Sequence, residues 1–214
     1  MNATEFYNVN KKYFISILLL VFTLSSVSMN AEESKFTESD FNKKYVKWVP
    51  SGSEQIEKKS FQIFECIPFG DSENHSLRFR SKQKSKKGKY TLSLFVKSNG
   101  IRFQNVTVYS RLKDKTWNEA IPEKIFSVTL DIHRAKSVDE NSISTYGEMD
   151  QSKIKKLGDD WLLWEIKFVN YIHEDPYRDL TLFFQFLNDQ KEKMYIADEK
   201  SSLLLSNIIL KSND

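Results

Sequence analysis

Apolar and polar residues alternate with a period of two along several stretches of this chain, most clearly between Trp161 and Phe186. A polar break containing Pro176 divides that stretch into two runs. In the second run one face carries Leu180, Leu182, Phe184 and Phe186, and the other carries Thr181, Phe183 and Gln185. A period of two is typical of a strand that is buried on one side.

The same alternation recurs at residues 76–80, 90–97, 103–110 and 126–133, and residues 61–67 are a further expected strand. Residues 203–210 are apolar on both sides and indicate a closing strand buried on nearly both faces. Short strands without a long helix predict an all-β protein. We expect a two-sheet antiparallel sandwich rather than a barrel.

Two regions leave the secondary structure open. In the polar segment 32–59, Phe41, Tyr45 and Trp48 fit one face of a short helix, or a first strand laid over the sandwich. Residues 134–160 form a long polar insertion, with one helical turn expected from Lys153 to Leu157. Long loops inside a compact domain are usually functional or mobile.

The N-terminal segment indicates export. Lys11 and Lys12 precede the apolar run Phe14–Leu24, and small residues follow as far as Ala31. The run is shorter than the ~20 residues that span a bilayer, which predicts a signal peptide over 1–31 rather than an uncleaved anchor. We therefore expect a secreted or periplasmic protein without a permanent membrane anchor. Its mature part would comprise a polar lead segment (32–59) and a β-sandwich domain (60–212).

Composition and charge exclude several classes. Hydrophobic residues make up 40% and aromatic residues 14% of the chain, which suits a packed core. The net charge is only +3, with both signs interspersed, and so predicts no nucleic-acid binding. Cys66 is the only cysteine, which excludes an intrachain disulfide and a cysteine zinc site. We expect it to pack as a small buried hydrophobe.

The order and the amino-acid sequences of the strands resemble those of the jelly-roll carbohydrate-binding modules, which include the xylan- and glucan-binding modules attached to glycosidases. The segments that carry the resemblance are SLRFRSK (76–82), KGKYTLSLFVKSNG (87–100), WLLWEIKF (161–168), LTLFFQF (180–186) and LLLSNIILK (203–211). The resemblance covers residues 61–211 and implies a jelly-roll sandwich of the galactose-binding-like type. It also implies adjacent aspartates in the closing strand that hold a structural calcium. Ser206 and Asn207 stand there instead, so we expect no cofactor and leave the calcium open.

Aromatic residues on the polar faces of the strands are the candidate binding groups. A sugar ring has apolar C–H faces and hydroxyl edges, so its site needs flat rings beside neutral hydrogen-bonding side chains. The candidates are Phe95, Tyr109, Trp117, Trp161, Phe183 and Gln185. They form one site only if their strands share a concave sheet. If the strands alternate between the two sheets, these rings pack under loops instead.

Motifs for catalysis are missing from the sequence. His75, His133 and His173 show no metal-ligand spacing, and there is no nucleophile elbow, phosphate-binding loop or carboxylate pair. A polysaccharide lyase of this fold would have to use residues such as His133, Tyr109 and Arg102, although nothing in their spacing requires it. We expect a non-catalytic module that binds a polysaccharide. The alternative is a protein–protein interaction domain that uses the Arg134–Asp160 loop.

Overall fold

Strands make up the regular secondary structure of the computed structural model, which describes residues 33–35, 41–44, 46–69, 75–112, 122–138, 143–173, 175, 177–187 and 200–213. In these residues the strands are β1 (Glu33–Lys35), β2 (Phe41–Lys44), β3 (Val46–Ile56), β4 (Lys59–Pro68), β5 (Ser76–Lys84), β6 (Gly88–Asn99), β7 (Phe103–Leu112), β8 (Glu123–Asp131), β9 (Lys136–Val138), β10 (Ile143–Ser144), β11 (Gly147–Lys156), β12 (Leu162–Asn170), β13 (Arg178–Leu187) and β14 (Ser202–Ser212). The predicted all-β class is confirmed.

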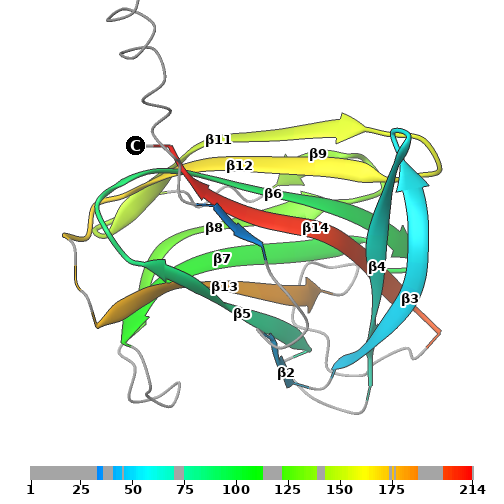
Figure 1. The fold of residues 1–214 in the computed structure, drawn as a ribbon, viewed down its shortest axis with the longest axis horizontal. Coiled ribbons are helices and arrows are strands. Elements are labelled where there is room, and N and C mark those ends of the chain that lie inside the picture. The colour runs from blue at the N-terminus through cyan, green and yellow to red at the C-terminus, as the bar shows by residue number, and fades with distance from the viewer. Residues whose placement is uncertain are drawn as a thin grey trace, which may run out of the picture. The chain divides into compact units, whose positions relative to one another are not determined.

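The described strands form two antiparallel sheets, seen as two layers in Figure 1. Sheet A contains eight of them, in the order β10-β11-β12-β6-β14-β4-β3 with β1 paired to β14, and sheet B contains six, in the order β2-β5-β13-β7-β8-β9. The chain passes from one sheet to the other between β1 and β2, β2 and β3, β4 and β5, β5 and β6, β6 and β7, β9 and β10, β12 and β13, and β13 and β14. This alternation is the jelly-roll sandwich that the sequence predicted.

The inward rows of the strands meet between the sheets and form the main core. The rows predicted from the alternation are 0–1% exposed at Tyr90, Leu92, Leu94, Val96, Val106, Val108, Phe126, Val128, Leu130, Leu180, Leu182, Phe184 and Phe186. Trp164, Ile166 and Phe168 of β12 are equally buried. Phe168 stacks on Tyr90 at a centroid distance of 5.3 Å and contacts Phe126 of the opposite sheet at 4.9 Å. These rings join the two layers.

The segment predicted as a polar lead contributes strands rather than a helix. Phe41 lies in β2 and Trp48 in β3, whereas Tyr45 lies outside the described residues. β3 pairs with β4 from Val46 to Ile56, and the turn residues Glu57 and Lys58 both have positive φ, as two-residue hairpins require. The helical alternative was therefore wrong, because the hairpin supplies the hydrogen bonds of this backbone.

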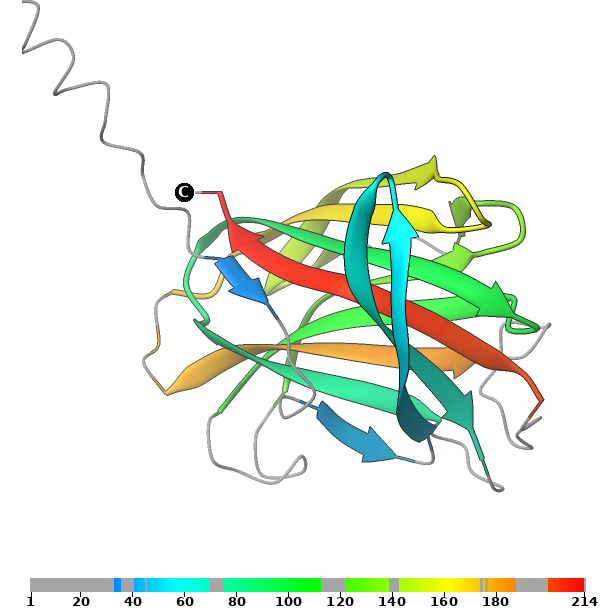
Figure 2. The ribbon, with the colours of Figure 1, turned by 45° about the vertical axis from the view of Figure 1, so that its right-hand side comes forward.

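The β3–β4 hairpin runs across β14 and β6 on the outside of sheet A (Figures 1 and 2). Its Ile56 and Ile63 form a second apolar cluster with Phe95 and Trp161, separate from the main core. Phe61 of β4 contacts Phe95 of β6 edge to face at 4.9 Å. The outward side of β6 is therefore covered by the chain itself. Cys66 of β4 lies opposite Leu203 of β14 and is 0% exposed, as expected of a small buried hydrophobe.

The region 134–160 is not the open insertion that its polarity suggested. It contributes β9, β10 and the ten-residue β11, and the expected helical turn at Lys153–Leu157 is instead the end of that strand. β11 pairs with β12 along its whole length, for example Ile154 with Trp164. Gly147 begins the strand where a Cβ would collide with the Ile125 side chain and the Val169 carbonyl. Backbone pairing and close approach thus stabilise a strand that has little apolar periodicity.

Asp131 fixes the turn between β8 and β9. Its carboxylate, 2% exposed, accepts hydrogen bonds from Nη2 of Arg102 at 3.2 Å and from the backbone N–H of Arg134 at 3.1 Å. Burial alone would raise the pKa of Asp131, but these hydrogen bonds and the two arginine charges outweigh it, and the pKa lies below its ordinary value. The folded state therefore favours the ionised carboxylate.

Asp131→Asn is expected to lower the free energy of unfolding by about 2 kcal/mol at pH 7, because it removes a buried charge-assisted interaction. Since the folded pKa lies below the unfolded one, the stabilisation is complete above about pH 4 and is lost as the pH falls through the folded pKa. Urea denaturation at pH 7 and at pH 3 measures this. The difference between wild type and variant should shrink at pH 3. Asp150→Asn, an exposed carboxylate of β11, is the control, and an equal difference at both pH values would contradict the prediction.

Residues 32–214 form one compact unit, and the described strands of segment 32–59 belong to its sheets. The predicted signal peptide, 1–31, lies outside the described residues and stays a prediction, as does export. No helix long and apolar enough to cross a membrane is found in the described residues.

Candidate functional site

On the outward face of sheet B, polar and aromatic side chains of neighbouring strands lie beside one another. β13 lies between β5 and β7, and its inward residues alternate with Asp179, Thr181, Phe183 and Gln185 on the outward side. Backbone register then sets the neighbours of these residues. Phe183 lies between Arg78 and Thr107, Thr181 between Arg80 and Tyr109, Gln185 between Ser76 and Asn105, and Asp179 between Lys84 and Arg111.

Tyr109 and Phe183 form an aromatic pair at the centre of this face. Their ring centroids are 6.4 Å apart with an interplanar angle of 81°, and both side chains are partly exposed. The guanidinium carbon of Arg78 lies 5.3 Å from the Phe183 centroid, within the range of a cation–π contact. Because the rings are nearly perpendicular, a flat ligand can stack on only one of them in this arrangement.

A network of amide and hydroxyl groups continues the face from β7 onto β8. The amide nitrogen of Asn105 donates to the hydroxyls of Ser127 at 3.0 Å and Thr129 at 3.1 Å, and its carbonyl oxygen accepts from the Thr107 hydroxyl at 2.9 Å. Thr107 and Ser127 are also within 3.0 Å of each other. These contacts hold the side chains in place before any ligand arrives. Hydroxyls of this kind can both donate and accept hydrogen bonds.

Three arginines lie along the other half of the face. Arg80 donates from Nε to a carboxylate oxygen of Asp179 at 3.1 Å. Burial lowers the pKa of Arg78 and of Arg111, and mutual repulsion adds to it, from Arg111 on Arg78 and from Arg80 on Arg111. Burial likewise raises the pKa of Tyr109, which the charge of Arg78 and a hydrogen bond with Thr107 partly offset.

Two predicted binding residues are buried and do not join this face. Phe95 belongs to β6 of sheet A and is 7% exposed, because the β3–β4 hairpin covers it. Trp161 is 1% exposed, and its indole N–H donates to Glu54 of β3 at 2.8 Å. The ammonium group of Lys97 lies 5.8 Å from its ring centroid. Both side chains therefore attach the hairpin to the sheet, and Trp161 does not present its ring at a rim.

Of the other predicted residues, Tyr109, Phe183 and Gln185 are brought together on sheet B, while Trp117 lies outside the described residues. The prediction that these rows lie on a concave surface stays a prediction. Arg78, Arg80 and Arg111 were not predicted from the sequence as part of this face. Arg78 and Arg80 alternate with the inward Leu77 and Phe79, and this pattern could have placed them outward.

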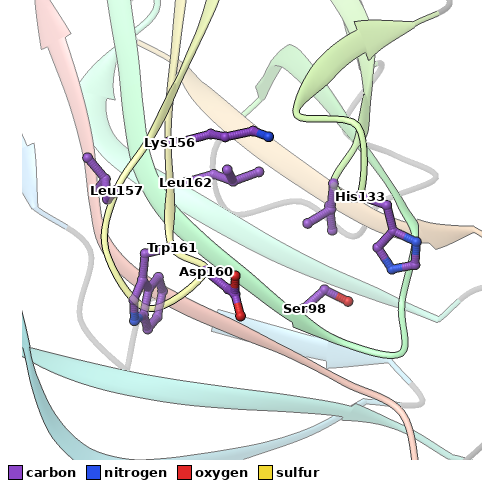
Figure 3. Close-up of a pocket in the computed structure, with 8 residues that line it drawn as sticks. Ser98, His133, Lys156, Leu157, Asp160, Trp161 and Leu162 are labelled. Atoms are coloured by element: carbon purple, nitrogen blue, oxygen red, sulfur yellow. The ribbon is translucent and has the colours of Figure 1, made fainter.

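A separate hollow of about 300 Å³ lies at one end of the sandwich. Figure 3 shows His133 on one side of it and the turn from Lys156 to Leu162 on the other. Its lining residues are Ser98, Ile132, His133, Lys156, Leu157, Asp160, Trp161 and Leu162. The ring of Trp161 is buried against the β3–β4 hairpin, so these lining residues offer no exposed aromatic ring to the hollow.

Ser206 and Asn207 stand where the resemblance implies calcium-binding aspartates, and the structure shows what they do instead. The Ser206 hydroxyl donates to the backbone carbonyl of Gln62 at 2.7 Å, and Asn207 has a positive φ within a bulge of β14. Across the described ranges there is no group of three or more histidine, cysteine or carboxylate side chains that could hold a metal. Calcium prefers several carboxylate and carbonyl oxygens, which this bulge does not bring together.

The residues considered for a lyase do not form one site. Arg102 precedes β7 and is ion-paired with Asp131 at 3.2 Å, whereas Tyr109 lies about 20 Å further along the strand. His133 lies in the turn after β8. A base and a carboxylate-neutralising group have to act on the same sugar ring, and Tyr109 is too far from Arg102 for that. His133 follows Ile132, whose backbone N–H donates to the Arg102 carbonyl, but the Arg102 guanidinium is already paired with Asp131.

Comparisons with known proteins give no match to any family model and no match among curated proteins. Solved structures that match include carbohydrate-binding modules. They include a family 27 module that recognises mannan, with 10% identity and a TM-score of 0.43 over 86% of this chain and 97% of that one.

A second match is the family 22 module with its glycosidase domain from a Clostridium thermocellum xylanase in complex with xylohexaose. It has 11% identity and a TM-score of 0.43, and covers 86% of this chain but 28% of that one. A third is a family 11 module of Clostridium thermocellum in complex with a mixed-linked tetrasaccharide, with 11% identity and a TM-score of 0.35 over 87% and 91% of the two chains. Likeness at this level does not extend to a ligand.

Proposed function

We propose that this protein is a non-catalytic module that binds a polysaccharide on the outward face of sheet B. The observation that carries the proposal is the aromatic pair of Tyr109 and Phe183, which lies beside the hydrogen bonds between the Asn105 amide and the Ser127 and Thr107 hydroxyls. Aromatic faces bind the C–H faces of sugar rings, and fixed amide and hydroxyl groups bind their hydroxyls.

The arrangement of the rest of the molecule supports the same face. The β3–β4 hairpin covers Phe95 and Trp161 on sheet A, so these rings cannot offer a platform there. Tyr109, Phe183 and Gln185 remain accessible on sheet B, on two neighbouring strands. The site is built on strands, which hold side chains in place more firmly than loops do.

Affinity gel electrophoresis on a panel of polysaccharides tests the proposal. At least one polymer is expected to retard the wild-type protein, and Phe183→Ala is expected to weaken that retardation at least tenfold, because it removes a central aromatic contact. Tyr171→Ala, which removes a partly exposed ring beyond β12 of sheet A, is the matched control and should bind as the wild type does. The proposal fails if no polymer retards the wild type. It also fails if Phe183→Ala and Tyr109→Ala both keep full retardation.

The alternative of a protein–protein contact through the 134–160 loop stays a prediction, although the described part of this region is not an open loop. The described part of that region forms β9, β10 and β11, and β11 is hydrogen-bonded to β12 along its length. A segment held in a sheet in this way is not a free recognition loop.

A further inference from the structure

We propose that the hollow at the end of the sandwich binds a small zwitterion of the α-amino acid class. Lys156 holds the carboxylate of the ligand, Asp160 holds its ammonium group, and the apolar floor of the hollow receives an uncharged side chain. This site goes beyond the proposed function and does not depend on the face of sheet B.

Backbone hydrogen bonds fix both walls of the hollow. On one side the N–H of Leu157 donates to the Trp161 carbonyl at 2.8 Å and closes the turn after β11. On the other side the N–H of Ile132 donates to the Arg102 carbonyl at 2.9 Å, which sets the chain just before His133. The backbone on both sides is therefore in place before a ligand arrives, and this lowers the entropic cost of binding.

Three ionisable side chains around the hollow have no partner in the part of the chain that the structure describes. His133, Lys156 and Asp160 form neither a hydrogen bond nor an ion pair there. Lys155, the neighbour of Lys156 on β11, is by contrast ion-paired with Glu57 of the hairpin turn. In Figure 3 Lys156 extends from one side of the hollow toward the side of His133, while Asp160 lies apart from both. A ligand with one negative and one positive group joins the two separated charges.

The remaining lining residues set the size and character of the ligand. Ile132, Leu157 and Leu162 are apolar, and Ile132 and Leu162 are only 7% and 5% exposed. The volume of about 300 Å³ lies at the lower end for ligand pockets and suits a small molecule rather than a stretch of polymer. The Ser98 hydroxyl donates to the Ile101 carbonyl and can still accept a hydrogen bond from the ligand. An amino acid with a branched apolar side chain, such as leucine, matches these properties.

The charged ends of Lys156 and Asp160 are exposed, so water screens them and each ion pair with the ligand stabilises it only modestly. We therefore expect weak binding, with a dissociation constant on the order of 1 mM for L-leucine. Nuclear magnetic resonance detects binding in this range and also shows where on the protein it occurs.

Titration of L-leucine into the isotope-labelled protein tests the site through its amide chemical shifts. We expect saturable shifts in the turns that contain His133 and Asp160, and none on β5, β7 and β13. N-acetyl-L-leucine lacks the ammonium charge and L-leucine amide lacks the carboxylate, so each should bind about tenfold more weakly. D-glucose and D-glucuronate are titrated alongside.

Variants with matched controls assign the two charges. Asp160→Asn and Lys156→Gln are each expected to weaken leucine binding about tenfold, because each removes a charge opposite the ligand. Asp159→Asn and Lys153→Gln remove the same charges from exposed residues that do not line the hollow, and both should bind as the wild type does. Asp159 and Asp160 have φ angles of 56° and 62°, a region that asparagine also adopts, so the two asparagine variants are equally compatible with the turn.

Absence of a saturable shift with leucine would overturn this inference, as would equal binding of leucine and its two derivatives. Tighter binding of glucose or glucuronate at the same turns would also overturn it and make the hollow a second sugar site. Retardation on polysaccharide gels depends on another face of the molecule, so either result can fail without the other.

Discussion

Trp164→Ala is expected to lower the free energy of unfolding by about 4 kcal/mol, because it empties a large volume in the main core. Trp164 is 0% exposed, lies on β12 between β6 and β11, and packs inward with Ile166 and Phe168. Its indole N–H also donates to the Ser152 hydroxyl at 2.9 Å. Urea denaturation measured by circular dichroism gives the change.

Trp164→Phe separates the two contributions of this residue. Phenylalanine keeps most of the packed ring but loses the hydrogen bond to Ser152, so the expected cost is about 1–2 kcal/mol. Equal destabilisation by the two variants would contradict the view that packing dominates. A variant that no longer unfolds cooperatively would show that this tryptophan is also needed for a unique core.

Trp161→Ala is expected to lower the free energy of unfolding by about 3 kcal/mol, with the effect concentrated in the β3–β4 hairpin. Trp161 joins Ile56 and Ile63 of the hairpin to Phe95 of β6, and it donates to Glu54. Native-state hydrogen exchange should therefore accelerate most in β3 and β4 and least in sheet B.

Variants at Glu54 provide the control for this second experiment. Glu54→Gln keeps an acceptor for the Trp161 indole N–H. It removes only the ion pair between the Glu54 carboxylate and Nζ of Lys97, which are 3.9 Å apart, so hydrogen exchange in the hairpin should change little. A uniform rise in exchange across both sheets in Trp161→Ala would show that the hairpin is not a separately stabilised unit.

Strand sequences with one buried face could be predicted, because alternation is a direct consequence of lying between core and solvent. β6, β7, β8, β13 and the inward half of β12 all showed it. β11 did not. Its sequence GEMDQSKIKK buries little, since Met149 and Ile154 alone pack against the core, and hydrogen bonds to β12 fix it in the sheet. Backbone hydrogen bonds to a neighbouring strand do not require apolar and polar residues to alternate, so they cannot be predicted from the strand's own sequence.

The candidate site was only partly predictable for a related reason. The side of the strand on which Tyr109 and Phe183 each lie follows from alternation. Their proximity depends on the pairing of β7 with β13, two strands that are far apart in the sequence. Phe95 has the same pattern and yet is buried, because a hairpin from elsewhere in the chain covers it. Likewise, a net charge of +3 excluded a long-range field, but it could not show that Arg78, Arg80 and Arg111 gather on one face.

The burial of Cys66 makes its reactivity a measure of local opening in the folded protein. Its sulfur is fully shielded where β4 lies against β14, and it is the only thiol in the sequence. A reagent such as dithionitrobenzoate needs an accessible thiolate and so can react only after the core around Cys66 opens. The rate of colour development in the native protein therefore reports that opening, without labels or engineered residues.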